Sequence, residues 1–195
     1  MSEQLEYADH AKHAAHANRQ IALLIAILAL FLALSETLGK SANTEAMTLN
    51  VKVSDLWNFF QAKNIRRTVV LAAADEMKIE AISATGDAKA AMNKQVATWQ
   101  DTAARYQSEP KPEGGEGTKE LAERAMGAEH ERDTALARYH NYELASAAFQ
   151  IGIVLCSAAV VTGILALAWG AAGVAFLGIV FTTLGLFAPH LLHIG

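Results

Sequence analysis

The last 52 residues of the chain, from Leu144 to Gly195, contain no Asp, Glu, Lys or Arg. About 20 apolar residues are enough for a helix to cross the ~30 Å hydrocarbon layer of a bilayer. The stretch is therefore long enough for two crossings, and the small residues of Trp169–Gly173 suit a tight reversal between them. The sequence predicts transmembrane helices over 146–169 and 171–188, followed by a short tail, 189–195.

Several signatures of chemistry are also missing. A single cysteine, Cys156, excludes a disulfide framework within the chain. There is no glycine-rich phosphate loop, no nucleophile elbow and no cluster of carboxylates and histidines at catalytic spacing. We therefore expect no enzymatic activity and no cofactor. A net charge of −4 without an arginine-rich tract argues against a nucleic-acid partner.

The two predicted C-terminal spans also lack the ionisable residues that transporters and proton pumps usually keep inside the membrane. An oligomeric channel or small-molecule conduit remains as an alternative, because the spans contain four polar residues able to line a pore: Ser157, Thr162, Thr182 and Thr183. The same residues, together with the glycines of these spans, suit close packing of helices. Packing is the interpretation that we favour.

The first 20 residues predict a polar leader helix. Its three histidines, His10, His13 and His16, spread over roughly 120° of a helix, so we expect a solvated helix and no metal site. The remaining histidines, His130, His140, His190 and His193, are interpreted as surface, seam or interfacial residues. Residues 21–38 predict the first span, an uncleaved anchor, because the leader is acidic and no small-x-small cleavage site lies near Lys40.

The segment between the first two spans, 39–145, predicts a helical extramembrane domain. Gly39–Thr44 is expected to break the helix, and almost every residue from Glu45 to Ser108 favours helix. The apolar residues of this arm do not keep one heptad, and Val69–Ala74 is apolar most of the way round, as in a helix buried among others. A straight arm would be roughly 96 Å long. We therefore expect a bend at Thr85–Asp87 and a compact set of three or more helices.

Prolines and glycines in Glu109–Gly117 predict a flexible loop, which we expect to form the tip of a helical hairpin. Thr118 is expected to cap the returning helix, which continues without a breaker into the second span. This helix contains a coiled-coil seam at alternating spacings of four and three: Leu121, Ala125, Ala128, Arg132, Ala135, Tyr139 and Tyr142.

The densest group of functional side chains lies early in the domain. The candidate interaction residues are Asp55, Trp57, Phe60, Gln61, Lys63, Arg66 and Arg67. Lys63 and Arg67 are four residues apart and share a helix face, which suggests a site for an anionic ligand or a lipid headgroup. The interpretation that we favour is a packing core from which the Lys and Arg side chains extend outward.

These residues also carry a family resemblance. The pattern Asp55-x-Trp57-x-x-Phe60-Gln61-Ala62-Lys63-x-Ile65-Arg66 resembles the signature of a bacterial family of membrane proteins known only as a domain of unknown function. Thr44-Glu45-Ala46 and Phe149–Ser157 extend the likeness over nearly the whole chain. The resemblance implies three spans with a helical domain between the first and second. It implies no activity, substrate or catalytic residue.

Taken together, the sequence predicts an all-α integral membrane protein that forms homo-oligomers among lipids and has a structural, scaffolding or partner-docking function. The alternatives are the conduit and a sensor of anions or lipid headgroups near Lys63. From its three spans and its resemblance to a bacterial family, we expect a multi-pass protein of the bacterial inner membrane. A slight excess of Lys and Arg beside the domain predicts that the domain and the C-terminus lie in the cytoplasm.

Overall fold

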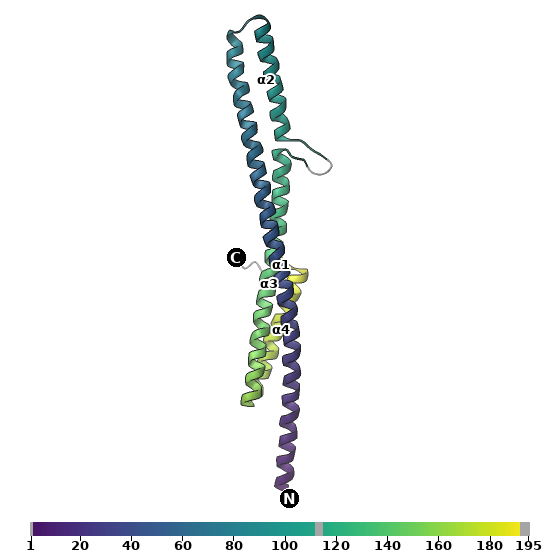
Figure 1. Cartoon of the computed structure of the whole chain (residues 1–195). Helices are drawn as coiled ribbons and strands as arrows, with labels where there is room; N and C mark the ends of the chain where they lie inside the picture. The colour runs from purple at the N-terminus through teal and green to yellow at the C-terminus, as the bar shows by residue number, and fades with distance from the viewer. Residues whose placement is uncertain (1, 112–114, 192–195) are drawn as a thin grey trace. The chain divides into compact units, whose positions relative to one another are not determined.

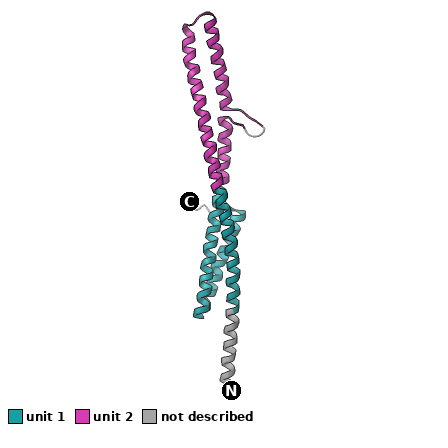
Figure 2. Ribbon diagram, in the orientation of Figure 1, with its two compact units in different colours: residues 1–46, 133–195 teal, residues 47–132 magenta. Residues whose placement is uncertain are grey.

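The computed structural model describes the backbone of residues 2–111 and 115–191, and the side chains of residues 19–111 and 115–191. Its elements are four α-helices and one short 3₁₀ helix: α1 (Ser2–Ser83), α2 (Gly86–Gln107), α3 (Thr118–Thr162), α4 (Leu165–Phe187) and η1 (Pro189–Leu191) (Figure 1). The predicted all-α class is confirmed. The chain divides into two compact units, unit 1 (residues 1–46 and 133–195) and unit 2 (residues 47–132) (Figure 2).

In unit 1, α1, α3 and α4 pack into a three-helix bundle in which α3 runs antiparallel to the other two. Phe149 of α3 is fully buried and stacks on Phe31 of α1, with ring centroids 5.7 Å apart. A Cβ added to Gly178 of α4 would lie 2.7 Å from the Phe149 ring. Glycine is therefore required where the α4 backbone approaches this ring, in line with the small-residue packing expected of these helices.

Three helices of the described chain contain a stretch long and apolar enough to cross a membrane, within Arg19–Ser83, Thr118–Thr162 and Leu165–Phe187. Each exposes large apolar side chains on its outer surface, for example Leu30, Val154 and Phe176, which are between 65 % and 70 % exposed. The structure therefore supports three candidate spans in unit 1.

The reversal between the second and third candidate spans is not where the sequence placed it. α3 ends at Thr162 and α4 begins at Leu165, so the chain turns at Gly163 and Ile164. Gly163 has a φ of +73°, a left-handed conformation that glycine adopts without steric cost. Trp169–Gly173 lies inside α4, and the predicted spans 146–169 and 171–188 are wrong at their shared end.

The predicted break at Gly39–Thr44 is also wrong, because α1 continues through it without interruption. A Cβ on Gly39 would lie 3.4 Å from Cβ of Tyr142, so this glycine provides close helix packing and does not end the helix. The hydroxyl of Thr44 donates a hydrogen bond to the carbonyl of Lys40, four residues earlier in the same helix. The predicted leader, span and arm thus form one helix.

Unit 2 is an antiparallel helical hairpin. The chain turns between Ser83 and Gly86, and Gly86 has a φ of +60°, as expected for the bend predicted at Thr85–Asp87. The expectation that Glu109–Gly117 forms the tip is wrong. Figure 2 shows this segment leaving the side of unit 2 between α2 and α3. The predicted flexibility concerns a loop whose residues 112–114 lie outside the described part of the chain.

The loop interrupts the returning arm without displacing it. The hydroxyl of Thr118 donates to the carbonyl of Gln107, so the first residue of α3 touches the last residue of α2. The outgoing arm from Met47 to Ser83 has 37 residues, and the 22 residues of α2 together with the 15 from Thr118 to Arg132 also make 37. The expected set of three helices is therefore a hairpin with two arms. The outgoing arm is α1, and the returning arm consists of α2 followed by the first part of α3.

Although the apolar residues of the outgoing arm alone do not keep one heptad, its buried face forms a continuous heptad seam. The seam positions are buried or half-buried and alternate at spacings of four and three: Leu49, Val53, Leu56, Phe60, Lys63, Arg67, Val70, Ala74, Met77 and Ala81. Trp57, Leu71 and Ala73 are half-buried beside the seam. Two of these positions are basic, while large apolar residues such as Val51, Ile65 and Val69 are exposed. The apolar pattern of the sequence does not reveal this seam, because apolar residues lie on both the buried and the exposed face of α1.

The returning arm packs on this seam as expected. Leu121, Ala125 and Ala128 are buried and form a cluster with Val53 and Leu56. Among the other members of the predicted α3 seam, Ala135 and Tyr142 are buried, and Arg132 and Tyr139 are half-buried.

Because Gln107 and Thr118 are in contact, the loop between them is expected to be removable only in steps that keep the seam in phase. On α2 the seam passes through Val96, Ala103 and Tyr106, and on α3 it resumes at Thr118 and Leu121. Deleting residues 109–116 puts Thr118 four positions after Tyr106, the spacing that the heptad requires. We expect this variant to keep its helix content by circular dichroism.

The matched control replaces residues 109–116 with two alanines. This control rotates the α3 seam by about 200° relative to α2. It should unfold at a clearly lower temperature than the eight-residue deletion, and equal melting temperatures would contradict a continuous seam.

Candidate functional site

The candidate interaction residues face different surroundings, although they lie within four turns of α1. Asp55, Gln61 and Arg66 are exposed, whereas Trp57, Phe60 and Arg67 are half-buried. Trp57 packs edge-on against Phe60, with centroids 5.3 Å apart, and its indole N–H donates to Glu129 at 2.9 Å. The aromatic part of the motif is therefore a packing element of unit 2.

Lys63 occupies a seam position and is only 8 % exposed. Its Nζ lies 5.5 Å from the ring centroid of Phe59 and 5.3 Å from that of Tyr106, and 3.8 Å from a carboxylate oxygen of Glu116. Cation–π contacts and one carboxylate thus replace part of the water that the ammonium loses. The expectation that this lysine extends outward is wrong. Tyr106 and Glu116 reach it from the interrupted arm.

Arg67, which shares the predicted face with Lys63, has a different partner. Its guanidinium donates to the side-chain oxygen of Gln107 at 3.0 Å. The two cations therefore have different partners, Glu116 of the loop for Lys63 and Gln107 at the end of α2 for Arg67. This arrangement supports the packing interpretation of the motif.

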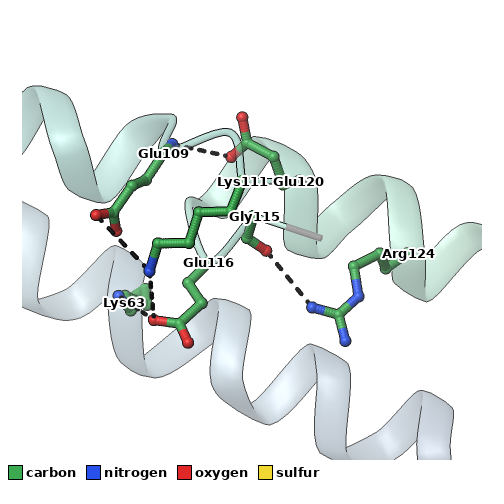
Figure 3. A network of polar contacts seen from close by, with 7 residues as sticks. All are labelled: Lys63, Glu109, Lys111, Gly115, Glu116, Glu120 and Arg124. Carbon is green, nitrogen blue, oxygen red and sulfur yellow. Dashed lines mark hydrogen bonds and ion pairs between the residues drawn. The ribbon is translucent and has the colours of Figure 1, made fainter. Parts of the chain in front are cut away.

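The loop beside Lys63 is held by a polar network (Figure 3). Nζ of Lys111 lies 3.9 Å from Glu109 and 3.8 Å from Glu116, so Glu116 faces two lysines. On the other side of the loop, the backbone N–H of Glu109 donates to Glu120 at 3.3 Å, and the Ser108 hydroxyl donates to the same carboxylate. Hydrogen bonding from Ser108 is the main reason why the pKa of Glu120 is lowered.

The histidines considered as metal ligands are dispersed or undescribed. Among residues with described side chains, no three His, Cys, Asp or Glu gather in a metal-binding group. His130, His140 and His190 are exposed. His190 makes a 3.0 Å hydrogen bond with Thr134 at the end of unit 1. The side chains of His10, His13, His16 and His193 lie outside the described residues.

The four polar residues considered for the lining of a pore all form hydrogen bonds within the helices of unit 1. Thr182 is buried and makes a 3.2 Å hydrogen bond with Ser35 of α1. The other three hydroxyls donate to backbone carbonyls of their own helices: Ser157 to Ile153, Thr162 to Ala158 and Thr183 to Ile179. The Thr182 contact joins α1 and α4 and supports helix packing, whereas Ser157, Thr162 and Thr183 are exposed and their bonds lie within their own helices.

Sequence reasoning did not identify Glu116, Tyr106 or Glu129 as partners of the motif. Tyr106 lies on a seam position of α2, so a correct heptad would have placed it opposite the motif. Glu116 had no comparable signal, because its position depends on where the loop folds back against the hairpin.

Substitution of Lys63 tests whether its buried charge and its contact with Glu116 stabilise the hairpin. A buried lysine pays a desolvation cost that a half-exposed carboxylate offsets only in part. We therefore expect Lys63→Met to leave the melting temperature of the full chain unchanged or to raise it. Lys63→Glu, which places two carboxylates together, should cost about 2 kcal/mol or more.

The matched control is Lys52→Met, which removes an exposed pair with Glu131 and should change stability by less than about 1 kcal/mol. A large loss of stability in Lys63→Met, comparable to that in Lys63→Glu, would show that the buried charge itself stabilises the hairpin.

Glu120 gives a prediction about pH. A carboxyl whose pKa is lowered on folding stabilises the folded loop above its ordinary pKa of 4.5, and this contribution is lost as the pH falls through the lowered value. We expect Ser108→Ala to raise the pKa of Glu120 towards 4.5, as measured by carboxyl NMR titration. Ser54→Ala, at an exposed serine, is the control. An unchanged Glu120 pKa in Ser108→Ala would rule out the Ser108 anchor.

Comparison with known proteins places this arrangement in a family. No curated protein and no solved structure matches the chain. A family model described as a domain of unknown function (DUF4337) matches residues 17–188, which include all three candidate spans and the whole of unit 2. The chain therefore belongs to the DUF4337 family.

Proposed function

We propose that this protein is a non-catalytic, multi-pass membrane protein that assembles with copies of itself and has a scaffolding or partner-docking function. The observation that carries the membrane part is a shared boundary in unit 1. Gly39 of α1 and Gly185 of α4 both contact Tyr142 of α3, so these three residues lie at one level of the bundle. Charged residues appear at this level, at Glu36 and Lys40 on α1, within one turn of Gly39, and at Glu143 on α3, whereas the sequence has none between Arg19 and Glu36 or after Glu143.

The dimensions and the interface residues agree with this placement. From Ile21 to Gly39, α1 is roughly 28 Å long, which matches the ~30 Å hydrocarbon layer. Tyr139 and Tyr142 lie at the shared boundary, and Trp169 is 74 % exposed in the second turn of α4, near the opposite end. Tyr and Trp are enriched at both membrane–water interfaces. Lipid would cover the exposed apolar side chains of the three helices.

The self-assembly part rests on the second face of α1 in unit 2. Val51, Ile65, Val69 and Ile79 are each at least 59 % exposed. Each lies two residues after a seam residue, a rotation of about 200°, so these four apolar residues share the face opposite the seam. We call them the outer stripe; Asp55, Asn58 and Glu76 occupy equivalent positions between them. This outer stripe explains why Val69–Ala74 is apolar most of the way round. Apolar residues in heptad register suit packing against another helix. A second copy of the chain presents the same face of α1 and can act as that partner.

We further propose that the protein resides in a bacterial inner membrane, with unit 2 outside the bilayer and in the cytoplasm. Charged residues distributed over unit 2, such as Lys52, Asp75 and Glu131, support its exclusion from lipid. The slight excess of Lys and Arg near the domain-side ends of the spans supports the orientation.

The outer stripe is tested by the mass of the full chain in detergent. Light scattering corrected for the micelle should give a discrete multiple of 20.9 kDa for the wild type. The double variant Ile65→Glu and Val69→Glu should give a smaller particle, because buried, unpaired carboxylates would oppose association. Both positions are exposed within one chain, so the hairpin itself should still fold.

The control adds the same two charges on exposed α2 positions, Asn93→Glu and Gln100→Glu, and should keep the wild-type mass. A monomeric wild type would contradict self-assembly. An unchanged mass in the Ile65 and Val69 variant would exclude the outer stripe as the interface.

A further inference from the structure

A groove between α1 and α3 opens in unit 1 at the proposed membrane boundary. Its volume is about 300 Å³. Its lining includes Glu36, Lys40 and Asn43 from α1 and Tyr139, Tyr142 and Glu143 from α3, together with Ser35 and Ser146 nearer the bundle core. Opposite charges, an amide and two phenols thus converge on one site. No residue of the groove belongs to the motif discussed above.

We propose that this groove binds the headgroup of a phospholipid that carries both a phosphate and a primary ammonium, as phosphatidylethanolamine does. The proposal rests on the membrane placement of unit 1 and adds a specific lipid to it. Phosphate binds to the Lys40 side of the groove, and ammonium binds between the two carboxylates.

The carboxylates have capacity to bind an ammonium. From the described residues, Glu36 accepts a single long hydrogen bond, from Gln150 at 3.4 Å. Glu143 accepts one from Tyr139 at 3.5 Å and lies 3.7 Å from Nδ1 of His140. Neither carboxylate is paired with Lys or Arg among the residues with described side chains. Each can accept several further hydrogen bonds, which an ammonium with three donors provides. The tyrosine rings add favourable cation–π contacts.

Lys40 supplies the complementary charge. Within the described part of the chain its ammonium makes no ion pair or hydrogen bond, although Glu36 is one turn away on the same helix. A lysine ammonium on a flexible four-carbon stem is a common ligand of phosphate. Among the described residues, the groove therefore holds the ammonium of Lys40, which has no ion pair, beside the carboxylates of Glu36 and Glu143, which can accept further hydrogen bonds. A zwitterion complements this arrangement better than a simple anion.

The depth of the groove favours a lipid over a soluble compound. It lies at the level of Gly39 and Tyr142, where the apolar part of the bundle ends. Along the helices from the groove towards the middle of the proposed span, the half-buried side chains of Leu32 and Ile153 pack against the core, and Ile151 is 54 % exposed. Acyl chains attached to a headgroup in the groove would run along these apolar residues, which a free headgroup would leave uncovered.

Native mass spectrometry of the full chain in detergent tests the proposal with added dioleoyl phosphatidylethanolamine or phosphatidylglycerol. We expect about tenfold tighter retention of phosphatidylethanolamine by the wild type. Lys40→Met should weaken retention of both lipids, because both carry the phosphate. Glu36→Gln with Glu143→Gln should weaken phosphatidylethanolamine alone and abolish the preference. Lys94→Met and Glu123→Gln, at exposed positions outside the groove, should behave as the wild type.

Equal retention of the two lipids by the wild type, or unchanged retention in the groove variants, would overturn the proposal. Displacement of the lipid by millimolar phosphoethanolamine would overturn it too, because the site would then recognise a soluble compound. Alkaline extraction of native membranes separates this failure from failure of the membrane placement. Protein that stays in the membrane but shows no lipid preference contradicts only the groove, whereas protein released without detergent contradicts both.

Discussion

Burial of one face of α1 by the helices that return along it is the interaction on which both units depend. In unit 1, α3 and α4 cover this face through small residues, so that Gly178 and Gly185 admit the rings of Phe149 and Tyr142. In unit 2, α2 and the first part of α3 cover it through a heptad seam. Because buried positions recur every three or four residues, α1 needs no break at Gly39 and can continue as one helix.

The seam of unit 2 is interrupted by charge at the level where the returning arm is itself interrupted. Lys63 is buried beside two aromatic rings, and the loop between α2 and α3 brings Glu116 to it. A buried ammonium is costly unless it is paired. The side excursion of the loop supplies a partner while the hydrogen bond from Thr118 to Gln107 keeps the two helix ends together. Packing and loop geometry therefore explain the most distinctive residues of the motif without a ligand.

The features without an internal partner suggest how the protein functions. In unit 2, an apolar stripe lies opposite the seam, and a helix from another copy would cover it. In unit 1, a groove at the boundary where apolar residues give way to polar ones is lined by Lys40, which has no ion pair among the described residues, and by the carboxylates of Glu36 and Glu143. Both features suit a protein that organises its surroundings through contacts with lipids and with copies of itself, and neither requires bond-making chemistry.

The sequence by itself determined the helical class, the three apolar stretches, the bend near Gly86 and the seam on α3, because these depend on composition, a single flexible residue or a clean local period. Only the tertiary structure decided where helices end and what they face. Gly39 and Gly163 are the same residue type, yet one packs inside a helix against Tyr142 and the other turns the chain at a φ of +73°. Lys63 looks solvent-facing by its charge and is buried because Glu116 and Tyr106 reach it from distant parts of the chain. The physical reason is that burial depends on partners far away in sequence, which no local pattern contains.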